Sequence, residues 1–207
     1  MDKIKVLLID DDIDWLKSLR LFLSNFDYIE VTGTLSNSEE LERFKDQLND
    51  VDIVLLDIQL NEDMSSGIYI AAQLAEYNTK IIILSSFDDE KTILDSFTAG
   101  AVNYIPKAEY RQIPYVIKQM ATKNPPIEVL ANSFAKQQEE KILSSLTSSE
   151  KEVLKLIQEG YSQTKISQIL CKSKGTIRCQ INKIIKKLDV KSSKEAVKKV
   201  SLRGFYK

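Results

Sequence analysis

The chain has 207 residues, with 29 Lys and Arg, 30 Asp and Glu and no histidine, so its net charge is −1. The absence of histidine excludes Ser-His-Asp catalysis and Cys₂His₂ zinc sites. The two cysteines, Cys171 and Cys179, fit neither a zinc motif nor a disulfide framework, which indicates a reducing compartment. No apolar stretch is long enough for a signal peptide or a membrane span, so we expect a soluble, cytoplasmic protein without membrane insertion.

The net charge hides an uneven distribution along the chain. Residues 1–140 carry 13 basic and 25 acidic side chains, whereas residues 141–207 carry 16 basic and 5 acidic ones, for net charges of −12 and +11. Such asymmetry favours an acidic domain joined to one that binds nucleic acid or an anionic surface. We therefore expect two modules with different partners.

Short apolar runs alternate with segments of helical periodicity across residues 1–122. The runs predict strands at residues 4–9, 28–33, 51–56, 80–84 and 101–105. The segments that follow them predict helices at residues 12–25, 37–48, 67–77, 89–99 and 110–122, and Ser38 is expected to start the second of these. Five βα units in sequence predict an α/β domain with a doubly wound, five-stranded parallel sheet. No GxGxxG follows the first run, which argues against a dinucleotide site.

Residues 123–145 are predicted to be a polar, partly helical linker, and residues 146–207 a small all-α domain of four helices. The turn between the second and third of these helices has helix-turn-helix spacing. Capping residues support the four boundaries. We expect Thr147 and Glu150 to cap the first helix, Gly160 to end it, Ser162 and Ser173 to cap the next two, Leu188 to end the third, and Ser192 or Ser193 to cap the fourth.

Acidic residues follow two of the predicted strands. Asp10, Asp11 and Asp12 end the first run, and Asp57 ends the third. Neighbouring parallel strands would bring these carboxylates together, and a cation would relieve their repulsion. Oxygen-only ligands suit Mg²⁺, beside which Asp57 could act as a nucleophile toward phosphoryl groups. The alternative interpretation is that these are solvated loop residues, and that alternative is the more frequent one for any single Asp.

Three further polar residues belong to the same predicted edge of the sheet. Ser85 follows the fourth strand, and Tyr104 and Lys107 lie at the end of the fifth. Lys107 and Ser85 could both bind phosphoryl oxygens. The ordered set of acid pair, Asp, hydroxyl, aromatic and Lys, one group per strand end, favours a phosphoryl site over solvated loops.

These residues occur in motifs that resemble a known family. The stretches VLLIDDD (6–12), LLDIQL (55–60), ILSSFDDE (83–90) and AGAVNYIPK (99–107) resemble the receiver domain of two-component response regulators, which has the CheY-like fold. The resemblance implies that a sensor histidine kinase supplies the phosphoryl group. It assigns the phosphoacceptor to Asp57, the Mg²⁺ ligands to Asp10, Asp11 (the direct ligand), Asp57 and the main-chain carbonyl of Gln59, the switch pair to Ser85 and Tyr104, and the phosphoryl-binding lysine to Lys107.

The segment after Asp57 departs from the family pattern. The family usually has a proline four residues after the phosphoacceptor and a glycine eight after it. Here Asn61 stands at the first position and the glycine is Gly67, so the 61–67 loop is about two residues longer. We expect this loop to alter the dephosphorylation rate or the docking of the kinase.

The predicted third helix of the second module has two contrasting faces. Ile177, Ile181, Ile184 and Leu188 have the spacing of a core stripe. The rest of the segment suits DNA, because Arg can read guanine, Asn can read adenine and lysines contact phosphates. The alternative is a merely solvated lysine-rich face. The predicted DNA-binding residues are Lys172, Lys174, Thr176, Arg178, Cys179, Asn182, Lys183 and Lys186.

Residues 146–200 resemble the LuxR-type helix-turn-helix of NarL/FixJ-class response regulators. The stretches LTSSEKEVLKLIQEGYSQTKISQIL and SKGTIRCQINKIIKKLDVKSSKEAV carry the resemblance. Lys165-Ile166-Ser167 replaces the usual Glu-Ile-Ala, which removes one expected salt bridge. Gln180 replaces a usual His and Asp189 a usual Gly, which puts the target sequence in question rather than DNA binding.

The sequence thus predicts a cytoplasmic transcription regulator that is not itself an enzyme. Phosphorylation of Asp57 would favour a homodimer, and two C-terminal domains would bind paired half-sites in double-stranded DNA. One alternative is a Mg²⁺-dependent phosphatase with an Asp nucleophile, but Gln59 occupies the place of its general acid. Another is a receiver that binds DNA without phosphorylation.

Overall fold

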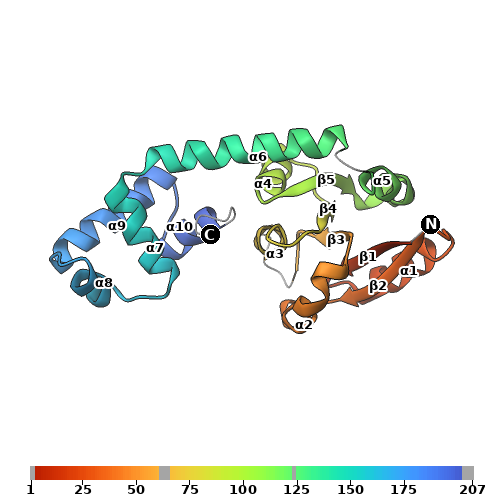
Figure 1. Cartoon of the computed structure of the whole chain (residues 1–207), viewed down its shortest axis with the longest axis horizontal. Coiled ribbons are helices and arrows are strands. Elements are labelled where there is room, and N and C mark those ends of the chain that lie inside the picture. The colour runs from red at the N-terminus through yellow and green to blue at the C-terminus, as the bar shows by residue number, and fades with distance from the viewer. Residues whose placement is uncertain (1–2, 61–65, 123–124, 202–207) are drawn as a thin grey trace. The chain divides into compact units, whose positions relative to one another are not determined.

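A computed structural model of the protein describes residues 3–60, 66–122 and 125–201. The chain divides into two compact units, Met1–Ala135 and Lys136–Lys207 (Figure 1). The first contains the sheet, and the described part of the second is entirely helical. The two-module organisation expected from the charge asymmetry is therefore present in the fold.

The first unit is built on a five-stranded parallel sheet with the strand order β2-β1-β3-β4-β5. This order reverses between β1 and β3, as the doubly wound α/β prediction requires. The strands are β1 (Ile4–Ile9), β2 (Ile29–Leu35), β3 (Ile53–Asp57), β4 (Lys80–Ser85) and β5 (Ala101–Pro106). The helices are α1 (Ile13–Leu23), α2 (Ser38–Phe44), α3 (Ser66–Leu74), α4 (Glu90–Thr98) and α5 (Ile113–Met120), with short 3₁₀ helices η1 (Lys45–Asp50) and η2 (Lys107–Gln112).

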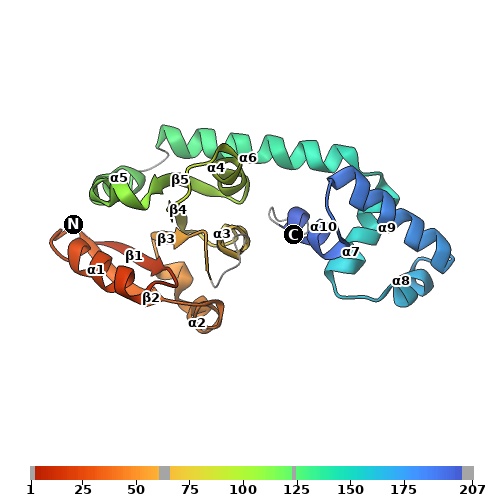
Figure 2. The ribbon, with the colours of Figure 1, turned by 180° about the vertical axis from the view of Figure 1, so that it is seen from behind.

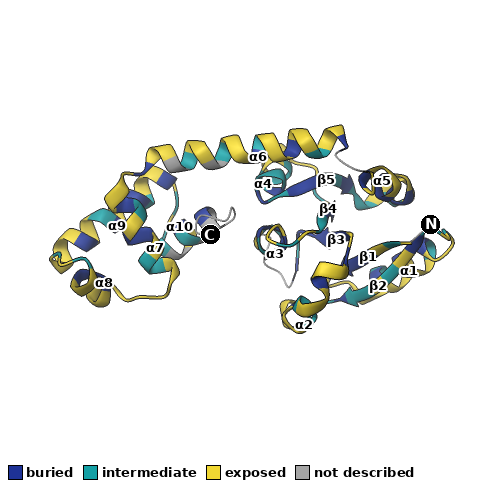
Figure 3. Ribbon diagram, in the orientation of Figure 1, coloured by how far each residue is buried: buried dark blue, intermediate teal, exposed yellow. Residues whose placement is uncertain are grey.

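Helices cover both faces of the sheet. Figures 1 and 2 show α1 and α5 on one side and α2, α3 and α4 on the other. Every residue of β3 is buried, which explains why this strand reads as a continuous apolar run rather than an alternating one (Figure 3). On the α1 and α5 side, the core combines Val6, Leu8 and Leu55 of the sheet with Leu19 of α1 and Ile117 of α5.

The starts of α1 and α2 show how short polar side chains set the helix boundaries. Asp12 caps α1, because its carboxylate accepts hydrogen bonds from the backbone N–H groups of Asp14 and Trp15. The prediction that Ser38 begins the next helix is confirmed. Asn37 is the cap, with its side chain accepting from the backbone N–H of Glu40 at 2.9 Å, and Ser38 is the first helical residue.

The predicted linker contains a long helix, α6 (Pro126–Ser145). The division between the two units, after Ala135, falls inside this helix. Much of its surface is exposed (Figure 3), including Val129 and Leu130, whereas Ala131 and Ala135 are buried. The prediction that residues 123–145 are partly helical therefore understates the extent of helix.

Four predicted helix caps in the second unit are confirmed. Thr147 and Glu150 form a capping box at the start of α7 (Ser148–Gln158), and Gly160 follows the helix with a φ of 83°. Ser162 caps α8 (Gln163–Ile169), and Ser173 caps α9 (Lys174–Leu188). Before α10 (Ser193–Ser201), Ser192 accepts from the backbone N–H of Glu195 at 3.1 Å.

The predicted apolar stripe of α9 forms the centre of the second unit's core. Ile177, Ile181, Ile184 and Leu188 are all buried, and they pack with side chains of α7, α8 and α10 such as Val153. The stripe fixes which side of α9 faces inward. The polar side of the helix is therefore left at the surface of this unit.

Candidate functional site

Three carboxylates meet where β1 and β3 end. Ile9 pairs with Leu56 in the parallel register, so Asp10 and Asp57 are brought side by side. One carboxylate oxygen each of Asp10, Asp11 and Asp57 lies within 4.8 Å of the others. Asp10 and Asp57 are buried, with 3% and 6% of their surface exposed, whereas Asp11 is exposed. The predicted acidic site therefore exists as a cluster with two buried members and an exposed rim.

Lys107 holds the two buried carboxylates together. Its Nζ atom lies 2.7 Å from an Asp10 oxygen and 2.9 Å from an Asp57 oxygen, and its side chain is largely buried. Lys107 directly follows β5, and the five-stranded order separates β5 from β3 by β4 alone. The structure thus places Lys107 at the position that the sequence motif predicts.

Burial and pairing oppose each other in the electrostatics of this site. Burial raises the pKa values of Asp10 and Asp57, and Lys107 offsets only part of that increase. Burial would by itself lower the pKa of Lys107, but the two carboxylates outweigh it and raise the pKa. Lys107 is therefore held as a cation, while the carboxylates retain a need for more positive charge.

The donor atoms of the cluster suit Mg²⁺. The three side chains offer only hard carboxylate oxygens, and the exposed rim at Asp11 leaves space for the waters that Mg²⁺ usually keeps. A divalent cation there would also relieve the repulsion that burial makes costly. The residues present therefore fit a magnesium ion.

Gln59 contributes to the site through its backbone. The backbone N–H groups of Ile58 and Gln59 lower the pKa of the Asp57 carboxyl group against the larger effect of burial. The predicted metal contact of the Gln59 carbonyl oxygen stays a prediction. Of the lengthened 61–67 loop, residues 61–65 lie outside the described part of the chain.

Gly67 approaches the end of β3 very closely. Its N–H donates to the carbonyl of Ile58 at 2.9 Å. A Cβ atom at Gly67 would lie 2.2 Å from the Asp57 backbone oxygen and 2.5 Å from Ile58 Cα. Only glycine fits this approach without a shift of the backbone, so α3 packs directly against the end of β3.

Ser85 and Tyr104 meet through the backbone of Phe87. Ser85 is completely buried at the end of β4, and its hydroxyl oxygen accepts from the Phe87 N–H at 3.1 Å. The Tyr104 hydroxyl donates to the Phe87 carbonyl at 2.7 Å. Burial raises the pKa of Tyr104, and the Ser85 hydroxyl opposes this increase. The two predicted switch residues are thus connected to one loop segment.

The eight predicted DNA-binding residues lie in or just before α9. Seven are exposed, and Lys172 is half-buried before the helix begins. Thr176 also takes part in the helix start, where its N–H donates to the Ser173 hydroxyl at 3.1 Å. No predicted residue of this set is in the core, so the geometry is compatible with a binding surface.

An ion pair between the exposed Lys187 and the buried Glu150, which sequence reasoning missed, joins α7 to α9. Lys187 Nζ donates to Glu150 at 2.7 Å, and the same carboxylate accepts from the Thr147 N–H at 2.8 Å. Only 5% of the Glu150 side chain is exposed. The capping box identified Glu150 in the sequence, but nothing local pointed to Lys187, because its partner lies in another helix.

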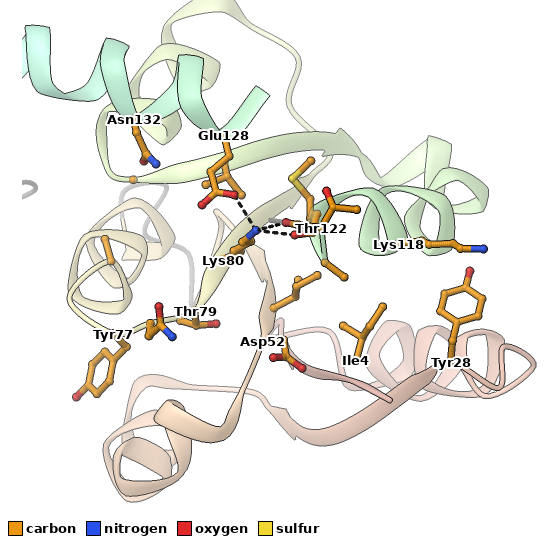
Figure 4. Close-up of a pocket in the computed structure, with 17 residues that line it drawn as sticks. Ile4, Tyr28, Asp52, Tyr77, Thr79, Lys80, Lys118, Thr122, Glu128 and Asn132 are labelled. Atoms are coloured by element: carbon orange, nitrogen blue, oxygen red, sulfur yellow. Dashed lines mark hydrogen bonds and ion pairs between the residues drawn. The ribbon is translucent and has the colours of Figure 1, made fainter. Parts of the chain in front are cut away.

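A hollow lies at the end of the first unit's sheet opposite to the carboxylate cluster, beneath the start of α6 (Figure 4). Its volume is about 990 Å³, and its lining includes Ile4, Asp52, Lys80, Glu128 and Asn132. Lys80 points toward Glu128 and the end of α5, as the dashed lines in Figure 4 show. The hollow is distinct from the carboxylate cluster.

None of the helices in the described residues is long and apolar enough to cross a membrane.

Two family models match the chain. The response regulator receiver domain matches residues 6–113, and the luxR family of bacterial regulatory proteins matches residues 144–200. The transcriptional regulatory protein LiaR of Bacillus subtilis (strain 168) is 32% identical over 202 residues, which span 93% of this chain and 94% of LiaR.

Solved structures of the response regulator RcsB share the fold. RcsB of Salmonella typhimurium is 22% identical with a TM-score of 0.53, covering 97% of this chain and 98% of RcsB. RcsB in a complex with DNA is 20% identical with a TM-score of 0.52, covering 97% of this chain and 99% of RcsB.

Proposed function

The chain belongs to the response regulator receiver family, and it joins this domain to a LuxR-type region, as NarL/FixJ-class two-component response regulators do. From this premise we propose that phosphorylation of Asp57 controls the binding of the protein to DNA. The family consists of transcription factors rather than enzymes. The receiver implies a histidine kinase as the phosphoryl donor. The proposal places this exchange in the cytoplasm.

The chemical step is transfer of a phosphoryl group to a carboxylate. An Asp57 oxygen attacks phosphorus, its bond to phosphorus forms as the bond to the donor nitrogen breaks, and the nitrogen of the kinase imidazole keeps the electron pair. The product on this chain is an acyl phosphate. Asp57 suits the role of acceptor because it ends a central strand. The protein has no histidine, so the donor imidazole has to come from the kinase.

The surrounding residues have separate roles in this proposal. Asp10, Asp11, Asp57 and the Gln59 carbonyl would hold Mg²⁺, which when bound neutralises charge on the phosphoryl oxygens. Lys107 would move its hydrogen bonds from the carboxylates to a phosphoryl oxygen. Ser85 would rotate so that its hydroxyl donates to another oxygen, and this rotation would move its own oxygen away from the Phe87 N–H.

The switch follows from the shared Phe87 segment. Because Ser85 and Tyr104 both bind the Phe87 backbone, a change at the Ser85 hydroxyl alters the support of the Tyr104 side chain. We expect the receiver surface near α4 and β5 to change, to favour a homodimer and to let two α9 helices engage paired half-sites.

DNA recognition is assigned to the exposed side of α9. Arg178 and Asn182 would read base edges, while Lys172, Lys174, Lys183 and Lys186 would contact phosphates. Thr176 and Cys179 complete the surface that we propose. The net charge of +11 in residues 141–207 supports attraction to DNA, and the solved RcsB–DNA complex is a precedent within the same fold.

The observation that carries the proposal is the contact of Lys107 with both Asp10 and Asp57 in a cluster of three carboxylates. We expect radiolabelled acetyl phosphate to label the protein in Mg²⁺, and Asp57→Ala to abolish the label. Asp88→Ala is a matched control, because Asp88 is an exposed acid at the same edge of the sheet. Labelling that survives in Asp57→Ala would overturn the assignment.

DNA binding is tested with duplexes selected from a random pool by the beryllofluoride-treated protein. Beryllofluoride should raise the affinity roughly tenfold in the wild type, a typical coupling between sites, and leave Asp57→Ala unchanged. An equal affinity with and without beryllofluoride would instead favour DNA binding independent of phosphorylation.

Arg178→Ala should relax the preference for a DNA sequence, whereas Lys183→Ala should reduce the salt dependence of DNA binding without changing that preference.

A further inference from the structure

The indole ring of Trp15 lies beside the ammonium group of Lys107. Lys107 Nζ is 5.7 Å from the ring centroid, within the range in which the face of an aromatic ring attracts a cation. Trp15 belongs to the first turn of α1, and Lys107 follows β5. The contact therefore connects the start of α1 to the lysine at the phosphoacceptor site.

A closed circuit of contacts fixes this arrangement. An Asp10 oxygen accepts from the Asp12 N–H at 3.0 Å, and an Asp12 oxygen accepts from the Trp15 N–H at 2.9 Å. The Trp15 ring contacts Lys107, and Lys107 returns to the other Asp10 oxygen at 2.7 Å. Asp12, the third member of the acidic run, thus sets the backbone position of Trp15.

Other aromatic side chains pack against the ring of Trp15. Tyr110 meets Trp15 edge-to-face at 6.2 Å, and Phe22 meets Tyr110 at 5.3 Å. Phe26 contacts Phe22 at 5.5 Å and Tyr28 at 6.0 Å. This aromatic row extends from Trp15 along the α1 and α5 side of the core, and its first member, Tyr110, limits the movement of the indole.

A tryptophan at position 15 lowers the stability of the fold in one respect, which indicates that its ring face has a role of its own. The Nε1 atom of Trp15 is buried and has no hydrogen-bond partner among the described residues. Such a group destabilises the protein, and phenylalanine would avoid the problem. Tryptophan, however, attracts a cation more strongly than any other aromatic side chain. The contact with Lys107 explains why this position carries the larger ring.

We propose that Trp15 is a positioning residue that holds the Lys107 ammonium beside Asp57 while leaving its N–H groups free for oxygen ligands. The proposal rests on the phosphoacceptor function proposed above. Lysine has a long, flexible side chain, and a ring face restrains it without competing as a hydrogen-bond acceptor. When a phosphoryl group draws Lys107 away from the carboxylates, the ring still limits where the ammonium lies.

The first test compares the rate of Asp57 labelling from acetyl phosphate among Trp15 variants. Trp15→Leu should slow labelling roughly five- to tenfold, as loss of a partly desolvated cation–ring contact predicts. Trp15→Phe should restore most of the rate, because it keeps a ring face. Phe26→Leu is the matched control, since it removes a ring of the same row that does not touch Lys107, and its rate should equal that of the wild type.

The second measurement is the fluorescence of Trp15, which is the single tryptophan of the chain. Its emission should differ between the wild type and Lys107→Met without any ligand, and should change when beryllofluoride and Mg²⁺ are added to the wild type. Phe26→Leu should respond as the wild type does.

Equal slowing in Trp15→Leu and Phe26→Leu, or no rescue by Trp15→Phe, would overturn the positioning role and leave a packing role only. Identical emission in the wild type and Lys107→Met would also overturn it. A wild type that accepts no label would refute the phosphoacceptor function instead, and the emission comparison would still decide whether Lys107 contacts the ring.

Discussion

Lys80, the first residue of β4, forms an ion pair of 2.7 Å with Glu128 in the first turns of α6. The same ammonium donates to the backbone carbonyls of Met120 and Thr122 at 2.7 and 3.1 Å. One side chain therefore joins the sheet, the end of α5 and the start of α6. Both partners are mostly buried, so their separation leaves a charge with little access to water.

Replacing Lys80 by methionine should lower the free energy of unfolding of the first unit by about 2 kcal/mol, because Glu128 and two carbonyls lose their partner. Urea unfolding followed by Trp15 fluorescence reports on this unit alone. Lys17→Met is the control: its pair with Asp14 is exposed, and its loss should change stability by less than about 0.5 kcal/mol. Equal effects of the two variants would contradict the role given to Lys80.

Magnesium should stabilise the first unit through the carboxylate cluster. At a concentration well above its dissociation constant, Mg²⁺ should raise the free energy of unfolding by roughly 1–3 kcal/mol. The gain should be largely lost in Asp11→Asn and Asp57→Asn, and a chelator should reverse it in the wild type. Thermal unfolding with and without MgCl₂ measures the difference. An undiminished gain in both variants would place the ion elsewhere.

In the metal-free first unit, Asp10 and Asp57 should stabilise the fold less as the pH rises above about 4. The folded pKa values of Asp10 and Asp57 are raised above the ordinary value of 3.8, chiefly by burial. The stability that these two carboxyl groups contribute is therefore complete below pH 3.8, and it is lost as the pH rises through their pKa values in the folded protein. Asp57→Asn should flatten this decline and raise stability near neutral pH by on the order of 1 kcal/mol. Urea titrations at several pH values, in chelator, measure it.

Gly67→Ala should destabilise the first unit by about 2 kcal/mol and slow the labelling of Asp57, because its Cβ would overlap the Asp57 backbone oxygen. Gly33→Ala offers a matched control in β2. There the nearest atoms belong to the side chains of Leu7 and Phe44, at 3.0 and 3.1 Å, and these can yield. A labelling rate in Gly67→Ala equal to that of Gly33→Ala would refute the importance of the close approach.

Lys187 and Lys186 should separate stability from DNA binding. Lys187→Met leaves the buried Glu150 carboxylate unpaired and should accelerate hydrogen exchange in α7 and α9 by roughly tenfold or more. Lys186→Met should leave exchange unchanged and weaken DNA binding. Exchange measured by mass spectrometry, together with DNA titrations, distinguishes the two. Faster hydrogen exchange in Lys186→Met but not in Lys187→Met would contradict the stabilising role given to Lys187.

The local features of the fold were predictable from the sequence. The strand runs, the capping box at Thr147 and the stripe from Ile177 to Leu188 depend on neighbours within a few residues. The grouping of Asp10, Asp57 and Lys107 was also predictable, because parallel strands end at the same edge of the sheet. The order of these residues along the chain then indicated which strand ends carry the predicted phosphoryl site.

Contacts between distant segments were not predictable in the same way. The pairs of Lys80 with Glu128 and of Lys187 with Glu150 depend on how helices pack, and no local pattern marks them. Trp15 had one local signal, since it lies three residues after the acid that caps α1. Its contact with Lys107 still required the three-dimensional placement of the start of α1 near η2, the segment that follows β5. The length of α6 was missed because its apolar residues do not follow a clear stripe.

The placement of the unit boundary inside α6 affects how the chain resists cleavage. Proteases bind extended backbone, and a residue in a continuous helix must first unwind over several neighbours to be cut. Ala135 and Lys136, where the units divide, offer no loop for such an attack. Digestion should therefore separate the units only as fast as α6 locally unfolds, which makes the cleavage rate a direct gauge of the stability of this helix.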